Sequence, residues 1–415
     1  MRYELRPYQQ EAADIAVDHL KTYGKPFVVQ AATGAGKSLI IADVCMSLDE
    51  PVLVLQPSKE LLEQNHAKLL SYDPDIDVGI YSASKNSKEI RKYTYATIQS
   101  IYRKPELFTH FKYVIIDECH QVNPKKLSGM YTSFLKAIGC RNVCGLTATP
   151  YRMDQKFFND NGQLTYTAYL KMINRIYPFF WKNIVYKVET QDLIDEGWLC
   201  AIKYKADDVD WNSLKVNSTG ADFTEESLER FSNDERLMKI AKSIKLIDEN
   251  CNRNLIFCSS LRAAERTRML LDTMGVRAEV VSSKTPKKTR EELVEAFRRG
   301  DFKHMINVGV FTTGFDVPEL DSIVLARPTM SLALYYQMVG RGVRKDPLNP
   351  EKKLRVFDFA GCVRRLGRVE SIRLAKEAPP DDFKDMVVSE VGRMDETPLF
   401  SFVVKKKMFQ KQRLI

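Results

Sequence analysis

A glycine-rich loop that follows an apolar run and opens a helix-like stretch limits the possible folds more than any other feature of the chain. The apolar run covers residues 26–30, and the loop reads Ala31-Ala32-Thr33-Gly34-Ala35-Gly36-Lys37-Ser38, with Ala31 where the usual pattern has its first glycine. Glycines let backbone N–H groups approach phosphates, and the following helix directs its positive end at them. Lys37 can then reach the β and γ phosphates, and the Ser38 hydroxyl suits Mg2+. The loop from Thr33 to Ser38 therefore predicts a nucleotide-phosphate site in a strand–loop–helix unit.

Short apolar runs alternate with helix-like stretches along most of the chain. They lie at 52–55, 113–116 and 143–146 in the first half and at 254–257, 278–281, 305–308, 323–325 and 354–357 in the second. This alternation predicts parallel sheets covered by helices on both faces. Because 415 residues exceed the roughly 250–300 at which single cores stop growing, we expect two α/β parallel-sheet domains in tandem.

Changes in this pattern set the expected domain boundaries. We expect the first domain at 1–200 and the second at 236–365, with a polar and poorly periodic connector at 201–235. An aromatic-rich insertion lies at about 151–185 and includes Tyr177, Phe179, Phe180 and Trp181. It could pack on the first domain or act as a strand-separating wedge, and we favour packing because large aromatic side chains are mostly buried. Residues 366–415 form a C-terminal extension with a basic tail.

Composition narrows the class of protein only a little. The 63 Lys and Arg residues exceed the 54 Asp and Glu residues, and the net charge of +9 fits a polyanionic partner without requiring one. The eight cysteines form no Cys-x-x-Cys pair, so we interpret them as reduced thiols and expect no zinc. The chain begins without a signal-peptide pattern and has no apolar stretch long enough to cross a bilayer. We therefore expect a cytoplasmic protein with no membrane partner.

Two polar segments follow neighbouring apolar runs of the first half. Asp117-Glu118-Cys119-His120 closes the run at 113–116, and Thr147-Ala148-Thr149-Pro150 closes the run at 143–146. Ligands of open α/β sheets bind at the carboxyl edge, where both segments are expected to lie. Asp117 would hold Mg2+, and Glu118 would orient or deprotonate the attacking water. The hydroxyls of Thr147 and Thr149 would relay the nucleotide state to the second domain. Taken alone, the acids could be solvated residues at a strand end, and the threonines an ordinary turn.

The second half carries two further candidate segments. In the stretch from Gln337 to Arg344, Arg341 and Arg344 are three residues apart and are expected to share one face of a helix. Arginines that arrive from a second domain would stabilise charge on a transferring phosphoryl group, although such pairs are more often a solvated or salt-bridged surface. In the stretch 312–318, Asp316 could accept hydrogen bonds from ribose, and Gly314 lets the backbone come close.

Together, these segments resemble the motifs of superfamily 2 helicases, in the family's order over residues 1–365. Leu5-Arg6-Pro7-Tyr8-Gln9 is similar to the adenine-reading motif, 31–38 to motif I, 117–120 to a DECH-type motif II, 147–150 to motif III, 312–318 to motif V and 337–344 to motif VI. More narrowly, the chain resembles bacterial RadD-like, phage UvsW-like and XPB-like DNA helicases. The resemblance implies two RecA-like domains with the ATP site in the cleft between them. It also implies that Arg6 and Gln9 contact adenine, that Arg341 and Arg344 act as arginine fingers, and that Gln337 belongs to the same catalytic motif.

The resemblance also implies a nucleic-acid strand that crosses both domains. The residues that match the strand-contacting motifs are Gln56, Pro57, Ser58, Thr97, Gln99, Ser259, Ser260 and Thr312. Small hydroxyls and backbone N–H groups suit contacts to phosphate that do not depend on base sequence. Several of these residues could equally be ordinary turn residues.

We therefore expect an ATP-dependent and Mg2+-dependent DNA helicase or translocase that acts in repair, recombination or replication. Its expected partners are single-stranded or branched DNA and other replication or repair proteins, and we expect a monomer. One alternative is an RNA helicase. Another is an ATP-gated motor subunit of a nuclease or defence complex that does not unwind by itself.

Overall fold

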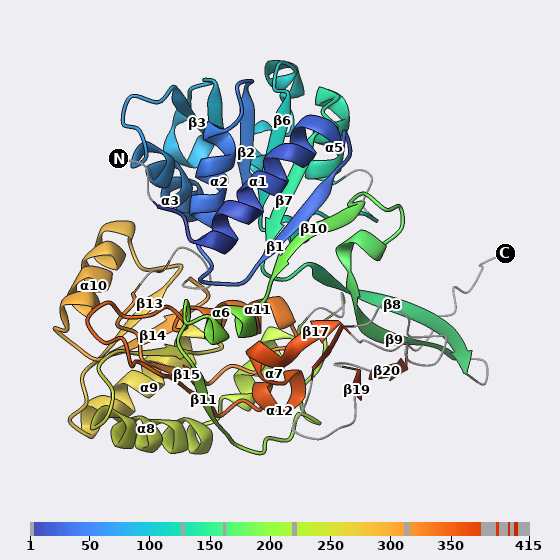
Figure 1. The fold of residues 1–415 in the computed structure, drawn as a ribbon. Helices are drawn as coiled ribbons and strands as arrows, with labels where there is room; N and C mark the ends of the chain where they lie inside the picture. Colours follow the sequence, from blue (N-terminus) through green and yellow to red (C-terminus); the bar gives the residue numbers. More distant parts are fainter. Residues whose placement is uncertain are drawn as a thin grey trace.

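The computed structural model describes residues 4–125, 129–160, 163–217, 222–310, 315, 317–374, 387–389, 397–398 and 402–405. The α-helices are α1 (Pro7–Thr22), α2 (Lys37–Met46), α3 (Lys59–Leu70), α4 (Ile98–Ile101), α5 (Met130–Ile138), α6 (Thr190–Asp195), α7 (Glu225–Phe231), α8 (Asp234–Asp248), α9 (Leu261–Thr273), α10 (Lys287–Arg299), α11 (Leu332–Gly340) and α12 (Cys362–Leu366). These helices cover two parallel sheets that lie one above the other (Figure 1).

The first sheet has eight strands in the order β10-β1-β7-β6-β2-β5-β3-β4. Their bounds are β1 (Phe27–Ala31), β2 (Val52–Gln56), β3 (Val78–Ser82), β4 (Ser87–Lys88), β5 (Tyr93–Thr97), β6 (Tyr113–Asp117), β7 (Val143–Thr147) and β10 (Asn183–Val188). All pairs are parallel except β3 with β4. Alternate residues of β1 face opposite cores, because Phe27 and Val29 pack with α1 and α2 whereas Val28 packs with α5. The predicted parallel sheet covered on both faces is therefore confirmed.

The second sheet has six strands in the order β11-β16-β15-β12-β14-β13, and all pairs are parallel. Their bounds are β11 (Ile202–Ala206), β12 (Asn254–Phe257), β13 (Ala278–Ser282), β14 (His304–Val308), β15 (Ser322–Leu325) and β16 (Leu354–Asp358). The segment expected to be a connector therefore begins with a strand of this sheet. β11 was not visible as an apolar run because it is an edge strand, in which Lys203 and Lys205 alternate with half-buried Ile202 and Tyr204.

The aromatic-rich segment divides into a hairpin, a loop and an edge strand. β8 (Tyr151–Asp160) pairs with β9 (Gln163–Met172) and extends away from both domains in Figure 1, where β20 (Phe402–Lys405) joins it. The short strands β17 (Ile372–Leu374), β18 (Val387–Ser389) and β19 (Thr397–Pro398) form a separate sheet. In the loop before β10, Trp181 is fully buried, whereas Tyr177 and Phe179 are 74% and 47% exposed. Packing thus accounts for Trp181 but not for the whole segment.

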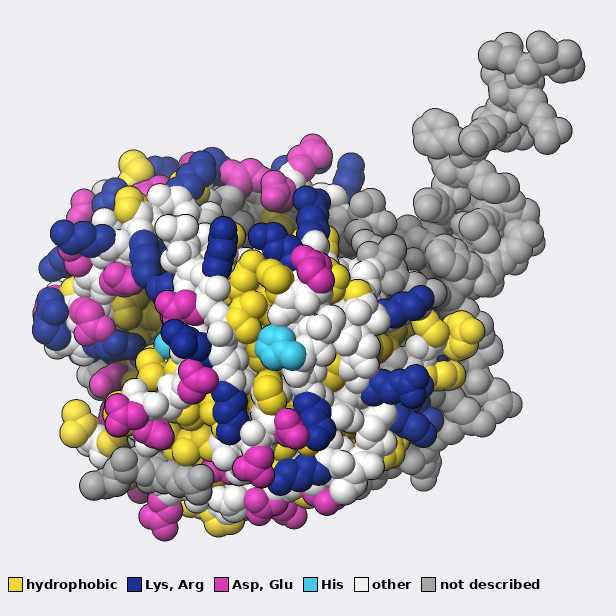
Figure 2. Space-filling model, turned by 90° about the horizontal axis from the view of Figure 1, so that it is seen from above, with side chains coloured by type: hydrophobic (Ala, Val, Ile, Leu, Met, Phe, Trp, Pro, Cys, Tyr) yellow, Lys and Arg dark blue, Asp and Glu magenta, His cyan; other side chains and the backbone are white. Residues whose placement is uncertain are grey.

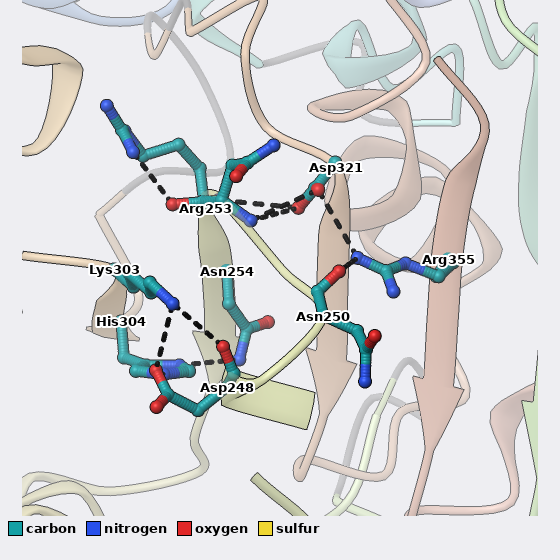
Figure 3. Close-up of polar contacts among 9 residues, drawn as sticks. Asp248, Asn250, Arg253, Asn254, Lys303, His304, Asp321 and Arg355 are labelled. Atoms are coloured by element: carbon teal, nitrogen blue, oxygen red, sulfur yellow. Dashed lines mark hydrogen bonds and ion pairs between the residues drawn. The ribbon is translucent and has the colours of Figure 1, made fainter. Parts of the chain in front are cut away.

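Polar side chains join the amino ends of the second sheet's strands (Figure 3). Asp321, just before β15, accepts hydrogen bonds from the backbone N–H of Arg253 and from the Arg355 guanidinium, at 3.3 and 3.2 Å. His304 at the start of β14 contacts the Asp248 carboxylate at 2.9 Å. The side chains of Asp248, His304, Asp321 and Arg355 are therefore paired at the amino edge of the sheet.

The surface of the first domain seen from above carries Lys and Arg interspersed with Asp and Glu (Figure 2). On this face the cationic side chains do not gather over one element. Within the described part of the chain, no helix has the length and apolarity needed to cross a bilayer.

Candidate functional site

The predicted phosphate loop joins β1 to α2 and is held in shape by two glycines and by α1. Gly34 and Gly36 have φ values of +86° and +81°, in the left-handed region that side chains with a Cβ rarely adopt. The amide of Gln9 donates to the Ala35 carbonyl at 2.7 Å, and the Tyr8 hydroxyl donates to the same oxygen at 3.0 Å. α1 is therefore fastened to the loop by two hydrogen bonds.

The two acids at the end of β6 lie beside this loop. Lys37 Nζ is 3.8 Å from the Glu118 carboxylate, and Glu118 itself has φ +49°, a strained value for a residue other than glycine. Burial raises the pKa of Glu118, but Lys37, His120 and Arg341 outweigh this effect and lower it to about 2. Burial and the neighbouring Glu118 charge raise the pKa of Asp117 to about 6. The two carboxyl groups therefore differ in chemistry although they are adjacent.

His120 connects this acid pair to the threonines at the end of β7. Its Nδ1 lies 3.3 Å from the Glu118 carboxylate, 2.8 Å from Thr147 Oγ1 and 3.3 Å from Thr149 Oγ1. The side chain of Arg152, at the start of β8, donates to the His120 carbonyl. A movement of the Glu118 carboxylate would therefore displace the His120 ring, and through it the Thr147 and Thr149 side chains.

The arginines of the second domain approach the same cleft. Figure 1 places α11 directly beneath the carboxyl end of β1. Arg341 is half-buried and donates to the Phe315 carbonyl at 3.2 Å. Burial lowers the pKa of Arg341 to about 10, against the opposing effect of Glu118. Arg344 Cγ would lie 3.6 Å from a Cβ on Gly34, so its side chain covers the phosphate loop.

The expectation that Arg341 and Arg344 share one helix face is wrong. α11 ends at Gly340, Arg341 is its C-cap, and Arg344 lies in an extended segment that forms a bridge with Leu199. The backbone leaves the helix here because the Val343 carbonyl accepts from the N–H of Cys200 at 2.9 Å. Tertiary hydrogen bonding therefore replaces the helical pattern at this point.

A cavity of about 290 Å3 opens between the two domains at the phosphate loop. Gly34, Gly36, Ser38, Arg6 and Gln9 line it from the first domain, and Pro318, Arg344 and Lys345 from the second. Trp198, which no sequence motif singles out, forms a further part of the wall. Part of the predicted phosphate loop and both adenine-contacting residues thus meet in one cavity, whereas Thr33, Ala35 and Lys37 do not line it.

Ser38 and Asp117 offer the donors that Mg2+ prefers. Mg2+ takes hard oxygen ligands and usually binds through one or two carboxylates together with substrate phosphates. Asp117 accepts hydrogen bonds from Asn65 Nδ2 and from the N–H of Glu118, both at 2.9 Å, and each carboxylate oxygen keeps a further lone pair. The donor set therefore fits Mg2+. Among the described residues, no group of three or more His, Cys, Asp and Glu could hold a metal ion, and the absence of zinc stays a prediction.

The predicted nucleic-acid residues lie where strands of both sheets end. Ser58 caps α3 by accepting from the N–H of Leu61 at 3.3 Å, and Ser260 caps α9 by accepting from Ala263 at 3.2 Å. Thr97 Oγ1 is 2.8 Å from Ser100 Oγ, and Ser259 Oγ is 2.7 Å from Ser232 Oγ. The remaining members are Gln56, which is fully buried at the end of β2, Pro57, and the exposed Gln99. The two serine caps place similar helix starts in the two domains.

Four candidates remain. Thr312, Gly314 and Asp316 lie outside the described residues, and Gln337 is half-buried in α11. Two contributors were not predicted from the sequence, namely Asn65, which orients Asp117, and Trp198. Neither belongs to a recognisable pattern, because each acts on residues far away along the chain.

Comparisons with known proteins identify the two halves of the chain. A family model described as "Type III restriction enzyme, res subunit" matches residues 2–152, and one described as "Helicase conserved C-terminal domain" matches residues 238–346. The chain is 26% identical over 383 residues to the "Putative ATP-dependent helicase IRC3" of Saccharomyces cerevisiae, which covers 86% of this chain and 52% of that protein. It is also 26% identical over 378 residues to the "DNA 3'-5' translocase XPB2" of Sulfurisphaera tokodaii, covering 83% and 79%.

A solved structure shares the fold. The fragment of a putative HsdR subunit of a type I restriction enzyme from Vibrio vulnificus superposes with a TM-score of 0.65 at 19% identity, over 89% of this chain and 67% of that chain. The chain spans 52–62% of the length of the first three curated relatives. The two matched family models, the order of the motifs and the two parallel sheets that meet at one cleft support a superfamily 2 helicase related to the XPB-like and restriction-type helicases.

Proposed function

We propose that this chain is an ATP-dependent DNA helicase or translocase that couples hydrolysis of Mg-ATP to movement on DNA or remodelling of DNA. The observation that carries the proposal is that Lys37, Glu118 and Arg341 converge in one cleft from three elements of two domains. Charges are costly to bury, and such groups gather where they act on a charged substrate. A role in repair, recombination or replication, a monomeric state and a cytoplasmic location are further parts of the proposal.

The residues of the cleft suit phosphoryl transfer. Lys37 and the first N–H groups of α2 would neutralise the phosphates. Lys37, His120 and Arg341 hold the pKa of Glu118 below its usual range, so Glu118 stays ionised at neutral pH. It is therefore better suited to orienting the attacking water than to keeping a proton taken from it. Arg341 and Arg344 would stabilise negative charge that develops in the transition state. Because both arginines belong to the second domain, hydrolysis would require the cleft to be closed.

Closure of the cleft would also change the nucleic-acid surface. The capped amino ends of α3 and α9 belong to different domains, and helix amino ends bind phosphate through backbone N–H groups. Ion pairs between the domains lie near α3, with Lys287 Nζ 3.3 Å from Glu63 and Arg290 4.0 Å from Glu60. A strand bound at both helix starts would therefore be moved when the distance between the domains changes, which is the basis of translocation.

The proposal is tested by steady-state ATP hydrolysis of the purified chain without nucleic acid and with single-stranded DNA, duplex DNA, branched DNA or RNA. Lys37→Ala serves as the blank in every condition. Strong stimulation by DNA supports the proposal, and the preferred form of DNA indicates whether unwinding or branch remodelling should be followed. Stimulation by RNA alone would replace DNA with RNA as the substrate.

A second candidate is a motor subunit of a nuclease or defence complex that does not unwind by itself. It is favoured by the restriction-enzyme description of the family model over residues 2–152 and by the shared fold of the Vibrio HsdR fragment. Displacement of a labelled strand from a forked duplex by the isolated chain separates the two candidates. DNA-stimulated hydrolysis without displacement would favour the subunit.

A further inference from the structure

We propose that Trp198 is a positioning residue for the base of the bound nucleotide, and that it links the base pocket to Arg344. The inference rests on the proposed ATP-dependent function and deepens it. Trp198 is half-buried and lines the cavity between the domains together with Arg6, Gln9 and Arg344. It comes from the segment after α6, which lies outside the motifs that the sequence pattern marks.

The indole of Trp198 lies under the Arg6 guanidinium. The Arg6 Cζ atom is 4.9 Å from the centre of the indole ring, and the Tyr8 ring meets the indole edge-on at 6.2 Å and 61°. Trp198 Nε1 donates to a Glu196 carboxylate oxygen at 3.0 Å, which fixes the rotation of the indole. The guanidinium therefore lies over an aromatic face whose own orientation is set by a hydrogen bond.

The indole is needed because Arg6 is held less firmly than its neighbours. Gln9 is fixed at both ends of its amide, since Oε1 accepts from the N–H of Arg6 at 3.0 Å and Nε2 donates to the Ala35 carbonyl at 2.7 Å. The Arg6 guanidinium has one side-chain hydrogen bond, from Nη1 to the Tyr8 hydroxyl at 3.2 Å. A long arginine side chain loses much rotamer freedom when it is ordered, and stacking on an aromatic face offsets that loss. A purine on the open face of the guanidinium would complete the stack.

The segment that carries the indole also contacts the phosphate loop and the second domain. The N–H groups of Trp198 and Leu199 both donate to the Leu193 carbonyl at the end of α6, at 2.8 and 2.9 Å. Leu199 forms a bridge with Arg344, and its Cδ2 would be 3.1 Å from a Cβ on Gly34. Leu199 thus links Trp198, its neighbour in the chain, to Arg344 across the bridge. A base that presses on Arg6 and Trp198 would therefore favour the arrangement in which Arg344 covers the phosphate loop.

The prediction is a loss of base discrimination in Trp198→Leu, which keeps apolar bulk but removes the aromatic face. Cation–π contacts are worth about two- to thirty-fold in affinity. We expect the Kd of Mg-ADP to rise by about this factor, and the KM of ATP to rise with it. The affinity for Mg-UDP should change much less, because a pyrimidine offers a smaller face for stacking. Trp198→Phe retains an aromatic face and should bind Mg-ADP almost as the wild type does.

The experiment is isothermal titration of the wild type, Trp198→Leu, Trp198→Phe and Lys37→Ala with Mg-ADP and with Mg-UDP. Tryptophan fluorescence is followed in parallel, because Trp181 and Trp211 are buried and the response to ADP should come from Trp198. We expect this response to disappear in Trp198→Phe while binding persists. Melting temperatures of all variants are measured so that a change in folding is recognised.

Two results would overturn the inference. One is a Trp198→Leu protein that binds both nucleotides as the wild type does, and the other is an equal loss of ADP and UDP affinity, which would indicate a structural role only. Failure of the proposed function has a different signature. In that case the wild type would bind ADP and UDP no better than Lys37→Ala, whatever residue stands at 198.

Discussion

Gly340→Ala should slow ATP turnover without destabilising the fold. Gly340 is the last residue of α11 and lies against Thr33 of the phosphate loop. A Cβ at position 340 would be 2.4 Å from Thr33 Cγ2 and 2.5 Å from Thr33 Cβ. Carbon atoms pack at about 3.5–4.0 Å, so α11 and the loop would have to separate by about 1 Å. Since Thr33 and Gly340 belong to different domains, opening the cleft relieves the clash.

The magnitude follows from the cost of overpacking. An added methyl group in a well-packed site costs about 1–3 kcal/mol, which corresponds to about a 5- to 150-fold fall in the population of the closed cleft. If hydrolysis requires closure, kcat should fall by that factor. Folding stability should not fall, because alanine is favoured over glycine in a helix by up to about 1 kcal/mol.

Gly342→Ala provides a matched control. A Cβ there would be 2.3 Å from Leu354 Cδ1 and 3.2 Å from Ile323 Cδ1, and both residues belong to the second sheet. This clash cannot be relieved by opening the cleft, so it should cost stability, at about 2–4 °C of melting temperature for each kcal/mol. The assay is kcat at saturating ATP and single-stranded DNA, combined with thermal unfolding. Wild-type kcat in Gly340→Ala, or a fall in its melting temperature equal to that of Gly342→Ala, would show that the contact with Thr33 does not control closure.

Other sites carry further expected outcomes. Glu118→Gln should abolish steady-state hydrolysis while the protein stays folded, because it removes a contact to the attacking water at a sheet edge. Normal turnover of the folded variant would contradict the assignment. Asn65→Ala should raise the half-saturating Mg2+ concentration of ATPase activity about ten- to a hundred-fold, because it removes the hydrogen bond that orients the Asp117 carboxylate. An unchanged Mg2+ titration would argue against Asn65 as a positioning residue for Asp117. His304 should lower the melting temperature as the pH drops below about 6.5, because burial lowers its pKa despite its hydrogen bond to Asp248, so that the unfolded chain takes up the proton first (Figure 3). Asp117 opposes this effect, because its raised pKa favours proton uptake by the folded protein, so the contribution of His304 is the difference between the wild type and His304→Asn. Lys303 also contacts Asp248. The melting temperature of a His304→Asn protein should therefore fall less at acidic pH than that of the wild type. An identical pH dependence in both proteins would exclude His304 as the cause.

Sequence patterns predicted those parts of the fold in which burial is continuous or regularly periodic. The apolar run at 52–55 lies in β2 (Val52–Gln56), and the run at 254–257 is β12. Edge strands were not predicted, because β10 and β11 have one side in solvent and mix charged with apolar residues. The course of the chain after Gly340 was also mispredicted. Its local spacing is helical, but hydrogen bonding to Cys200 draws the backbone into an extended conformation.

Residue order alone was enough to predict the local chemistry, namely a phosphate loop before a helix, two acids at a strand end and two arginines in one segment. These features depend on neighbours along the chain, so residue type and spacing carry them. Three contacts became visible only in the folded molecule: Arg341 acts on Glu118, Asn65 orients Asp117, and Trp198 lies under Arg6. Such contacts join residues 52 to 223 positions apart. The contact of Arg341 with Glu118 forms because the two domains meet at one cleft, whereas the other two form because elements of the first domain pack on one another. Packing of that kind depends on the shapes of whole domains, which no local pattern encodes.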